Sequence, residues 1–163
     1  MTELIRDIIS VSTAGPGDIS NIFSWRNDPF TRQQSLNTEL LCWKEHQDWF
    51  EKVLDSEDCC LLMCFSESRQ TKIGVVRFDI VRNQATVSIN LDPTVRGQGL
   101  GTHCLSKAID YFLNRFSSIK SLRAKVLTGN IASRIVFKKV GFEFDASSDG
   151  TEEFVLSINR VGY

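Results

Sequence analysis

A turn with glycine at every second position, formed by Gly97, Gly99 and Gly101, is the feature that most constrains how this chain can fold. A run rich in β-branched residues precedes it at 85–91, and an amphipathic segment follows it at 100–116, so the sequence predicts a strand, a tight turn and a helix. Glycines let backbone N–H groups approach an anion, and the first turn of a helix supplies unpaired N–H donors. The unit is therefore expected to bind a diphosphate, and a plain strand-to-helix connection is the alternative.

Two common nucleotide-binding loops do not fit this turn. Counted from Gly97, a dinucleotide-binding G-x-G-x-x-G loop requires glycine at the position that Thr102 occupies. A P-loop requires Gly-Lys-Ser/Thr after its last spacing, and the chain has no such tripeptide there. The diphosphate is therefore expected to bind in a turn of a different kind.

Strand and helix patterns alternate along the rest of the chain, without an internal repeat or a Pro/Gly/Ser-rich linker. This order predicts a mixed α/β fold in which about four helices flank one sheet, and residues 1–163 are expected to form a single domain. The expected strands are residues 5–11, 59–65, 72–81, 85–91, 122–127, 142–145 and 153–158; the expected helices are one capped by Asp18, then 43–54, 100–116 and 131–140, the last capped by Asn130 and ended by Gly141.

Charge and cysteine usage argue against several classes of function. The net charge of -1 gives no general attraction to nucleic acid or to an anionic membrane. The longest apolar run, residues 59–65, is too short to cross a bilayer, and the first residues lack the pattern of a signal peptide, so a cytoplasmic protein is expected. The five cysteines include no C-x-x-C pair and only two histidines accompany them, which favours reduced thiols and no metal site.

Two motifs carry a resemblance to a known family. Residues 96–101, Arg-x-x-Gly-x-Gly between a strand and a helix, look like the coenzyme A motif of the GNAT superfamily of N-acetyltransferases. Residues 130–142, Asn-x-x-Ser-x-x-x-Phe-x-x-x-Gly-Phe, resemble the helix that follows it in that superfamily. The element order extends the resemblance from about residue 4 to residue 159. It implies the GNAT fold, with a splayed and mostly antiparallel sheet, and acetyl-CoA as the acyl donor with no metal.

The resemblance also implies roles for individual residues. The amides of residues 98–102 would hold the pyrophosphate with Arg96 adding charge nearby, and the backbone of residues 89–91 would pair with the pantetheine arm. Asn130 and Ser133 would contact the coenzyme, the alternatives being a helix cap and an exposed helix residue. The full set of residues expected at the coenzyme is Ile89, Leu91, Arg96, Gly97, Gln98, Gly99, Leu100, Gly101, Thr102, Asn130, Ser133 and Phe137.

The chain departs from the family where proton transfer is concerned. Phe137 stands where many members have a tyrosine that protonates the departing thiolate, and the strand at 85–91 has no carboxylate to act as a base. Asn90, which could order a water, and Ser133, which could donate a proton, are the catalytic candidates. An amine with a pKa near neutrality needs little help, which favours amino sugars or peptide N-termini, at about 7.7–8.0, over lysine, at about 10.4.

The acceptor is expected to bind the N-terminal third of the chain. Trp-Arg-Asn at 25–27 and His-x-x-Trp-Phe at 46–50 are similar to one branch of the superfamily, which contains nucleotide-linked 4-amino-sugar and ribosomal-protein N-terminal acetyltransferases. Arg26 could bind a phosphate, and His46 and Trp49 could contact the acceptor; packing in the core or at the surface is the alternative for each. The acceptor is therefore expected to be a small-molecule amine, most favourably a nucleotide-linked amino sugar. A peptide N-terminus and coenzyme binding without turnover are the rivals, and the oligomeric state stays open, with a homodimer among the options.

Overall fold

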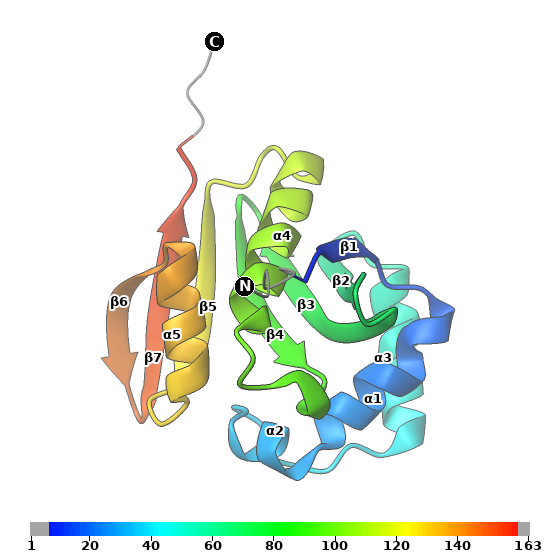
Figure 1. Cartoon of the computed structure of the whole chain (residues 1–163). Coiled ribbons are helices and arrows are strands. Elements are labelled where there is room, and N and C mark those ends of the chain that lie inside the picture. Colours follow the sequence, from blue (N-terminus) through cyan, green and yellow to red (C-terminus); the bar gives the residue numbers. More distant parts are fainter. Residues whose placement is uncertain (1–6, 160–163) are drawn as a thin grey trace, which may run out of the picture.

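The computed structural model describes residues 7–159, which form one seven-stranded sheet with helices on both faces (Figure 1). The strands follow the order β1-β2-β3-β4-β5-β7-β6, and all neighbours are antiparallel except β4 and β5. The strands are β1 (Ile9–Thr13), β2 (Cys59–Ser66), β3 (Thr71–Val81), β4 (Gln84–Leu91), β5 (Ser121–Leu127), β6 (Glu143–Ser148) and β7 (Thr151–Ser157). The expected mixed and mostly antiparallel α/β fold is confirmed; Ile5 and Arg6 of the expected first strand lie outside the described residues.

The sheet splays open between β4 and β5. These parallel strands pair over three positions only, from Gln84 opposite Ser121 to Thr86 opposite Arg123. On its other edge β4 stays paired with β3 along its whole length. The backbone of β4 beyond Thr86 therefore has polar groups on the β5 side that no neighbouring strand pairs.

Two layers of helices cover the sheet. α4 and α5 pack together on one face and enclose the larger core, in which Phe78 of β3 stacks on Phe112 at 4.0 Å between ring centroids. α1 and α3 cover β2 and β3 on the other face around Trp25 and Phe50 (Figure 1). The helices are α1 (Ile19–Asn27), α2 (Pro29–Gln33), α3 (Trp43–Leu54), α4 (Leu100–Arg115) and α5 (Ile131–Val140), with short 3-10 turns at Pro16–Asp18 and Pro93–Val95.

The sequence did not predict α2, so that residues 7–159 contain five α-helices and not about four. Pro29 cannot continue α1 because it lacks an N–H, but it is well suited to the first turn of a new helix. Asp28 caps that helix, its carboxylate accepting a hydrogen bond from the Thr31 amide at 3.0 Å. The chain therefore turns at Asp28 and lays α2 across the lower end of β4 (Figure 1).

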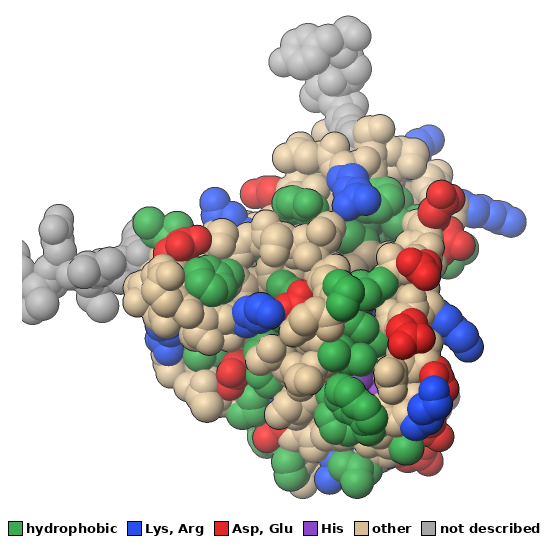
Figure 2. Space-filling view, turned by 90° about the vertical axis from the view of Figure 1, so that its right-hand side faces the viewer, with side chains coloured by type: hydrophobic (Ala, Val, Ile, Leu, Met, Phe, Trp, Pro, Cys, Tyr) green, Lys and Arg blue, Asp and Glu red, His purple; other side chains and the backbone are tan. Residues whose placement is uncertain are grey.

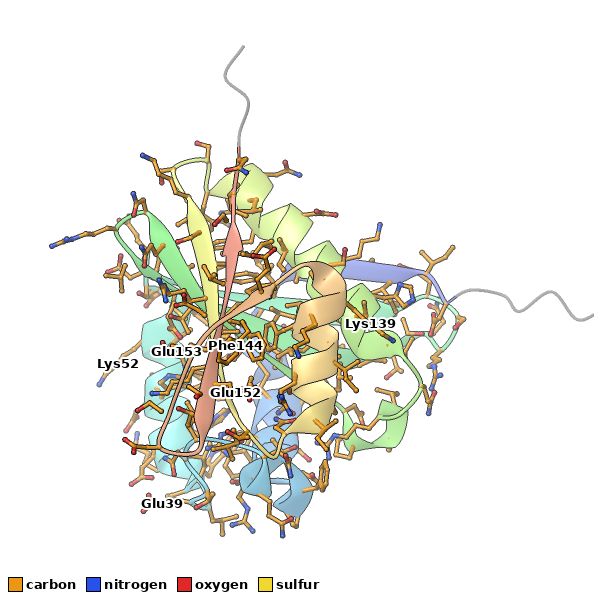
Figure 3. The ribbon with its side chains drawn as sticks, turned by 90° about the vertical axis from the view of Figure 1, so that its left-hand side faces the viewer. Glu39, Lys52, Lys139, Phe144, Glu152 and Glu153 are labelled. Atoms are coloured by element: carbon orange, nitrogen blue, oxygen red, sulfur yellow. The ribbon has the colours of Figure 1, made fainter. Side chains whose placement is uncertain are left out.

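The face of the molecule that carries α1 and α3 has side chains of mixed character (Figure 2). Acidic and basic side chains are interspersed there around apolar ones. At the far end of the sheet, β6 leaves Phe144 exposed (Figure 3). None of the helices within residues 7–159 is both long and apolar enough to cross a membrane.

Candidate active site

The glycine turn presents free backbone donors. Gly97 and Gly99 have φ angles of 72° and 76°, in the left-handed region that favours glycine. A Cβ added at either position would meet nothing within 4 Å, so the space beside the turn is open. The amides of Gly97, Gln98 and Gly99 make no hydrogen bond within residues 7–159, and no side chain caps the start of α4. These donors, together with the positive end of the α4 dipole, suit a diphosphate.

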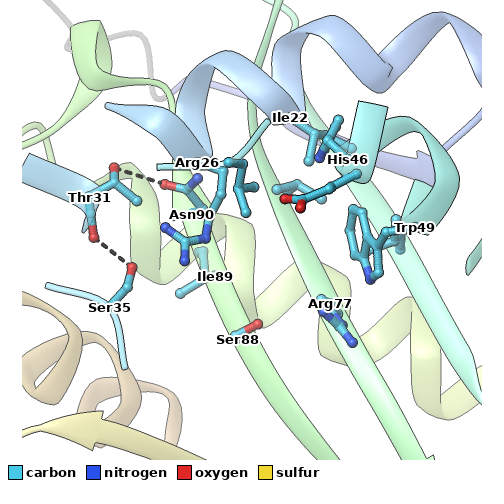
Figure 4. A pocket seen from close by; sticks show the side chains of 14 residues that line it. Ile22, Arg26, Thr31, Ser35, His46, Trp49, Arg77, Ser88, Ile89 and Asn90 are labelled. Atoms are coloured by element: carbon cyan, nitrogen blue, oxygen red, sulfur yellow. Dashed lines mark hydrogen bonds between the residues drawn. The ribbon is translucent and has the colours of Figure 1, made fainter. Parts of the chain in front are cut away.

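Three cavities meet where β4 leaves the sheet. The turn cavity, about 150 Å³, extends from Arg96 and Gly101 to α5. The helix cavity, about 490 Å³, lies between α1, α3 and the face of β2 to β4 (Figure 4). The splay cavity, about 240 Å³, lies between β4 and β5. Ser35 and Ile89 line all three cavities, so a ligand in the turn cavity can meet one in either of the others at that point.

Asn90, one of the two catalytic candidates, lines both the turn and the helix cavity and so lies at their junction. Its Oδ1 accepts a hydrogen bond from the Thr31 hydroxyl at 3.4 Å (Figure 4). This contact occupies the oxygen of the amide and leaves its Nδ2 donor without a partner among the described residues. Asn90 can therefore donate a hydrogen bond to a ligand at the junction.

The two polar residues at the start of α5 have different surroundings. Asn130 caps the helix by accepting from the Ser133 amide at 3.1 Å, and its Nδ2 donates to the Gln34 carbonyl at 3.2 Å. Its side chain thus acts as the helix cap. Ser133 lines both the turn and splay cavities, and its hydroxyl has no hydrogen-bond partner among residues 7–159. Ser133 therefore has a free donor at the place where the coenzyme is expected.

Phe137 is 2% exposed, and its ring packs edge-on against Phe142 with 5.1 Å between centroids. It reaches the floor of the splay cavity but brings no proton there. Tyr111 lines none of the three cavities, and Cys104 is fully buried in the core. Among residues 7–159, therefore, no tyrosine and no cysteine lines any of the three cavities.

Arg96 faces α2. Its guanidinium pairs with the Asp28 carboxylate at 2.8 Å, donates to the Thr31 hydroxyl and lies 5.5 Å from the centre of the Phe30 ring. Hydrogen bonds from Arg96 and from the Thr31 amide hold the pKa of Asp28 below its usual value, so this carboxylate is ionised at neutral pH. The Arg96 charge is therefore balanced by Asp28.

Arg26, the predicted phosphate ligand, lines the helix and splay cavities. Its Nη2 donates to the Asn37 carbonyl at 2.6 Å, while its Nη1 is buried without a hydrogen-bond partner in the described chain. No carboxylate within residues 7–159 pairs with it. Burial and then the charge of Arg32 lower the pKa of the Arg26 guanidinium, because both disfavour its charged form.

His46 is 2% exposed on the wall of the helix cavity. Its Nε2 lies 3.2 Å from the Ile19 carbonyl, a contact that requires the Nε2–H tautomer. Burial lowers its pKa, so the ring is neutral at pH 7, and its Nδ1 is enclosed without a partner in the described residues. The Trp49 ring is tilted against the His46 ring, with 5.4 Å between their centroids. The Arg77 guanidinium lies over Trp49, with its Cζ 5.3 Å from the centre of the Trp49 ring (Figure 4). Trp49 thus forms part of the cavity wall, whereas Phe50 is in the core.

Several cavity residues were missed by the sequence analysis. Thr31 and Ser35 bring two hydroxyls to the junction, and Ser35 donates to the Thr31 carbonyl at 2.6 Å. Glu45 and Arg77 add one charge of each sign to the helix cavity. The Asp-Pro-x-Thr sequence at residues 28–31 carries a capping signal that could have located the hydroxyls. Arg77 and Glu45 reach the cavity through strand pairing and helix packing, for which no local motif exists.

Comparison with known proteins settles the family. A model of the acetyltransferase (GNAT) domain matches residues 11–143, which is most of the chain. The chain belongs to the GNAT acetyltransferase family. This GNAT protein is therefore an N-acetyltransferase that uses acetyl-CoA, and coenzyme binding without turnover is set aside. A comparison with curated proteins finds no match.

Solved structures share the fold of this GNAT acetyltransferase at low sequence identity. A domain from Methanocaldococcus jannaschii DSM 2661 is 20% identical with a TM-score of 0.80, covering 93% of this chain and 99% of its own. Spermidine N-acetyltransferase from Vibrio cholerae, in complex with CoA and spermine, is 14% identical with a TM-score of 0.81 and covers 91% and 95%. Campylobacter jejuni N-acetyltransferase PseH, in complex with acetyl coenzyme A, is 17% identical with a TM-score of 0.72 and covers 93% and 100%.

The residues present fit acetyl-CoA. The open amides at 97–99 match a pyrophosphate, and the unpaired edge of β4 matches the amide groups of a pantetheine arm. The turn cavity continues from that edge to the junction at Asn90. Within residues 7–159, no group of acidic, histidine or cysteine side chains could hold a metal ion.

Proposed function

We propose that this GNAT acetyltransferase acetylates an amine whose molecule also carries an anionic group, with a nucleotide-linked amino sugar as the acceptor. Arg26 carries the proposal. Its charge is partly buried, faces two cavities and has no carboxylate partner in the described chain. A desolvated guanidinium is costly unless an anion pairs with it, and a phosphate is the anion that its planar fork binds best.

The charged residues that line the helix and splay cavities support an anionic ligand. Arg26 and Arg77 line the helix cavity, Lys125 lines the splay cavity, and Glu45 is the acidic residue at either. Asp79 pairs with Arg77 at 2.7 Å, whereas no carboxylate among residues 7–159 pairs with Arg26 or Lys125. Lys125 is exposed to solvent, so Arg26 is the more buried of these two unpaired charges. A polycation would meet repulsion here, because like charges in a cleft of low dielectric repel strongly.

The size and walls of the space also support the proposal. The helix cavity alone, at about 490 Å³, falls within the range of about 300–1,000 Å³ that small-molecule sites occupy. Trp49 of α3 supplies an aromatic wall suited to a sugar or base, and Ser88 of β4 adds a hydroxyl to the same cavity (Figure 4). The WRN and HxxWF motifs that suggested this acceptor class thus supply residues of one cavity, Arg26, His46 and Trp49.

Acetyl-CoA supplies an activated thioester, and the protein orients the amine against it. The neutral amine forms the new C–N bond, the C–S bond breaks with its electron pair going to sulfur, and the amine loses a proton to water. The Asn90 Nδ2 donor at the junction would stabilise the negative charge that develops on the thioester carbonyl oxygen. The Ser133 hydroxyl would donate to the departing thiolate, whose parent thiol has a pKa of about 8.5. His46 does not act as the base, because its Nδ1, the nitrogen that could accept a proton, is buried in the protein.

The test replaces the proposed phosphate ligand. Arg26→Met should lower kcat/KM for a uridine-diphosphate 4-amino-sugar by about tenfold or more, the value of a charge-assisted hydrogen bond. The same variant should leave the rate for the free 4-amino-sugar unchanged, because that acceptor has no phosphate. Lys52→Met, which removes an exposed cation on α3 (Figure 3), is the matched control. Equal losses for both acceptors, or no loss, would contradict the role of Arg26.

A peptide N-terminus is the second candidate acceptor. The presence of Glu45 in the helix cavity favours it. This carboxylate lines the helix cavity and could attract the ammonium group of a basic peptide. The same peptide would have to approach Arg26, Arg77 and Lys125, so the charge balance favours the anionic acceptor.

A further inference from the structure

Helix α2 and the turn after it form a shared wall of the site. Thr31 and Ser35 line both the turn cavity, where acetyl-CoA is expected, and the helix cavity, where the acceptor is expected. Any shift of α2 would therefore change the junction at which the two ligands meet.

Packing alone does not fix this helix. α2 has five residues, none of them buried, and Phe30 is 55% exposed. A helix this short has no stability of its own in water, because its nucleation cost is not recovered. The position of α2 must therefore depend on its specific contacts.

Beyond its chain neighbours, α2 and the residues on either side of it have three hydrogen-bonded links to elements that the coenzyme is expected to touch. The Asp28 carboxylate pairs with Arg96 of the glycine turn at 2.8 Å, with both side chains about three quarters buried. Thr31 bonds to Asn90 of β4 at 3.4 Å. The Gln34 carbonyl accepts from Asn130, the cap of α5, at 3.2 Å.

The ion pair is the strongest of these links. Arg96 donates to Asp28 and to the Thr31 hydroxyl at once, and it lies over the Phe30 ring. A charge-assisted contact in a partly buried place is worth more than the neutral bonds at Thr31 and Gln34. Asp28 also caps α2, so one carboxylate both starts the helix and ties it to the turn.

We propose that Asp28 is a positioning residue, which holds α2 on the coenzyme turn through Arg96 and so couples coenzyme binding to the shape of the acceptor site. A coenzyme that orders residues 96–101 orders Arg96 with them, and Arg96 in turn holds the wall that Thr31 and Ser35 form. By linkage, docked α2 favours coenzyme binding as much as the coenzyme favours docked α2. The inference rests on the transferase activity of the family and is independent of which acceptor is used.

The test uses Asp28→Asn and coenzyme A itself. Asparagine caps a helix about as well as aspartate, so the substitution removes the charge of the ion pair and keeps the cap. Asp145→Asn is the control, because it removes the charge of a second ion pair, which joins Asp145 of β6 to Arg123 at 3.1 Å and is more exposed than that of Asp28. Arg96→Gln, alone and combined with Asp28→Asn, completes a double-mutant cycle.

Hydrogen–deuterium exchange of residues 29–37 is the readout, with and without coenzyme A. In wild type and Asp145→Asn, the protection factor of these residues should rise when coenzyme A binds. In Asp28→Asn this rise should be smaller by about fivefold or more, which is the low end of measured coupling energies. Its melting temperature and the exchange of α4 should match the control, and the double variant should add little to either single one. Unchanged protection of α2 in Asp28→Asn, or no gain in wild type at saturating coenzyme, would overturn the proposal. Neither result depends on the acceptor.

Discussion

A carboxylate at Gly99 should abolish coenzyme binding while the fold survives. Gly99 precedes α4 with φ at 76°, and a Cβ there has no neighbour within 4 Å, so an added side chain fits the protein itself. The left-handed backbone costs a side chain about 1–2 kcal/mol, less for Asp and Asn, which enter this region more readily. Gly99→Asp and Gly99→Asn are therefore expected to unfold at similar temperatures, a few degrees below wild type.

The difference between these two variants isolates charge. Asp and Asn have nearly the same shape, but only Asp places a negative charge beside the pyrophosphate. At a separation of about 5 Å and an effective dielectric constant of about 20, the repulsion is about 3 kcal/mol for each unit charge. That energy corresponds to about a hundredfold or more in Kd.

Isothermal titration calorimetry with coenzyme A, alongside thermal unfolding followed by circular dichroism, measures both quantities. We expect Gly99→Asn to bind within a few-fold of wild type and Gly99→Asp to bind at least about a hundredfold more weakly. Wild-type affinity in Gly99→Asp would refute the placement of the pyrophosphate at this turn. Equal and large losses in both variants would show that the backbone conformation, and not electrostatics, governs binding.

Two further predictions concern buried rings. Phe137→Ala should lower the free energy of unfolding by about 3–5 kcal/mol in a denaturant titration, because the Phe137 ring is 2% exposed and packs against Phe142. A stable but inactive variant would show instead that the Phe137 ring shapes the active site. Burial lowers the pKa of His46 below the usual value of about 6.5, so the unfolded chain binds a proton at this residue more tightly than the folded protein does. The neutral ring should therefore contribute to stability above about pH 6.5, and this contribution should be lost as the pH falls through the folded-state pKa. Wild type should therefore lose more melting temperature than His46→Gln between pH 7 and pH 5, and parallel losses would contradict a buried neutral ring.

The fold was largely readable from the sequence because its signals are local. Helical spacing of apolar residues predicted a helix at 43–54, and α3 has those bounds. Asn130 and Gly141 predicted the ends of α5, and the structure shows Asn130 accepting from the Ser133 amide and Gly141 at φ 111°. Caps, glycines and periodicity are properties of neighbouring residues, so one sequence suffices to find them.

The site was only partly readable because its contacts join distant segments. Arg96 was expected to face the pyrophosphate, but its partner Asp28 lies 68 positions away in the sequence, on a helix too short to show an apolar period. Ser35 reaches the junction for the same reason, carried there by α2. The role of Arg96 toward the coenzyme and the catalytic roles of Asn90 and Ser133 therefore stay predictions.

Competition between acceptors distinguishes an anionic acceptor from a cationic one. The protein would be incubated with acetyl-CoA and equal amounts of a uridine-diphosphate 4-amino-sugar, a basic peptide with a free N-terminus, and spermidine, and the acetylated products would be quantified by mass spectrometry. We expect the acetylated nucleotide sugar to dominate, because Arg26 is a partly buried charge at the helix and splay cavities with no carboxylate partner among residues 7–159. Dominant acetylation of spermidine or of the peptide would contradict an anionic acceptor and would make Glu45 the residue to examine next.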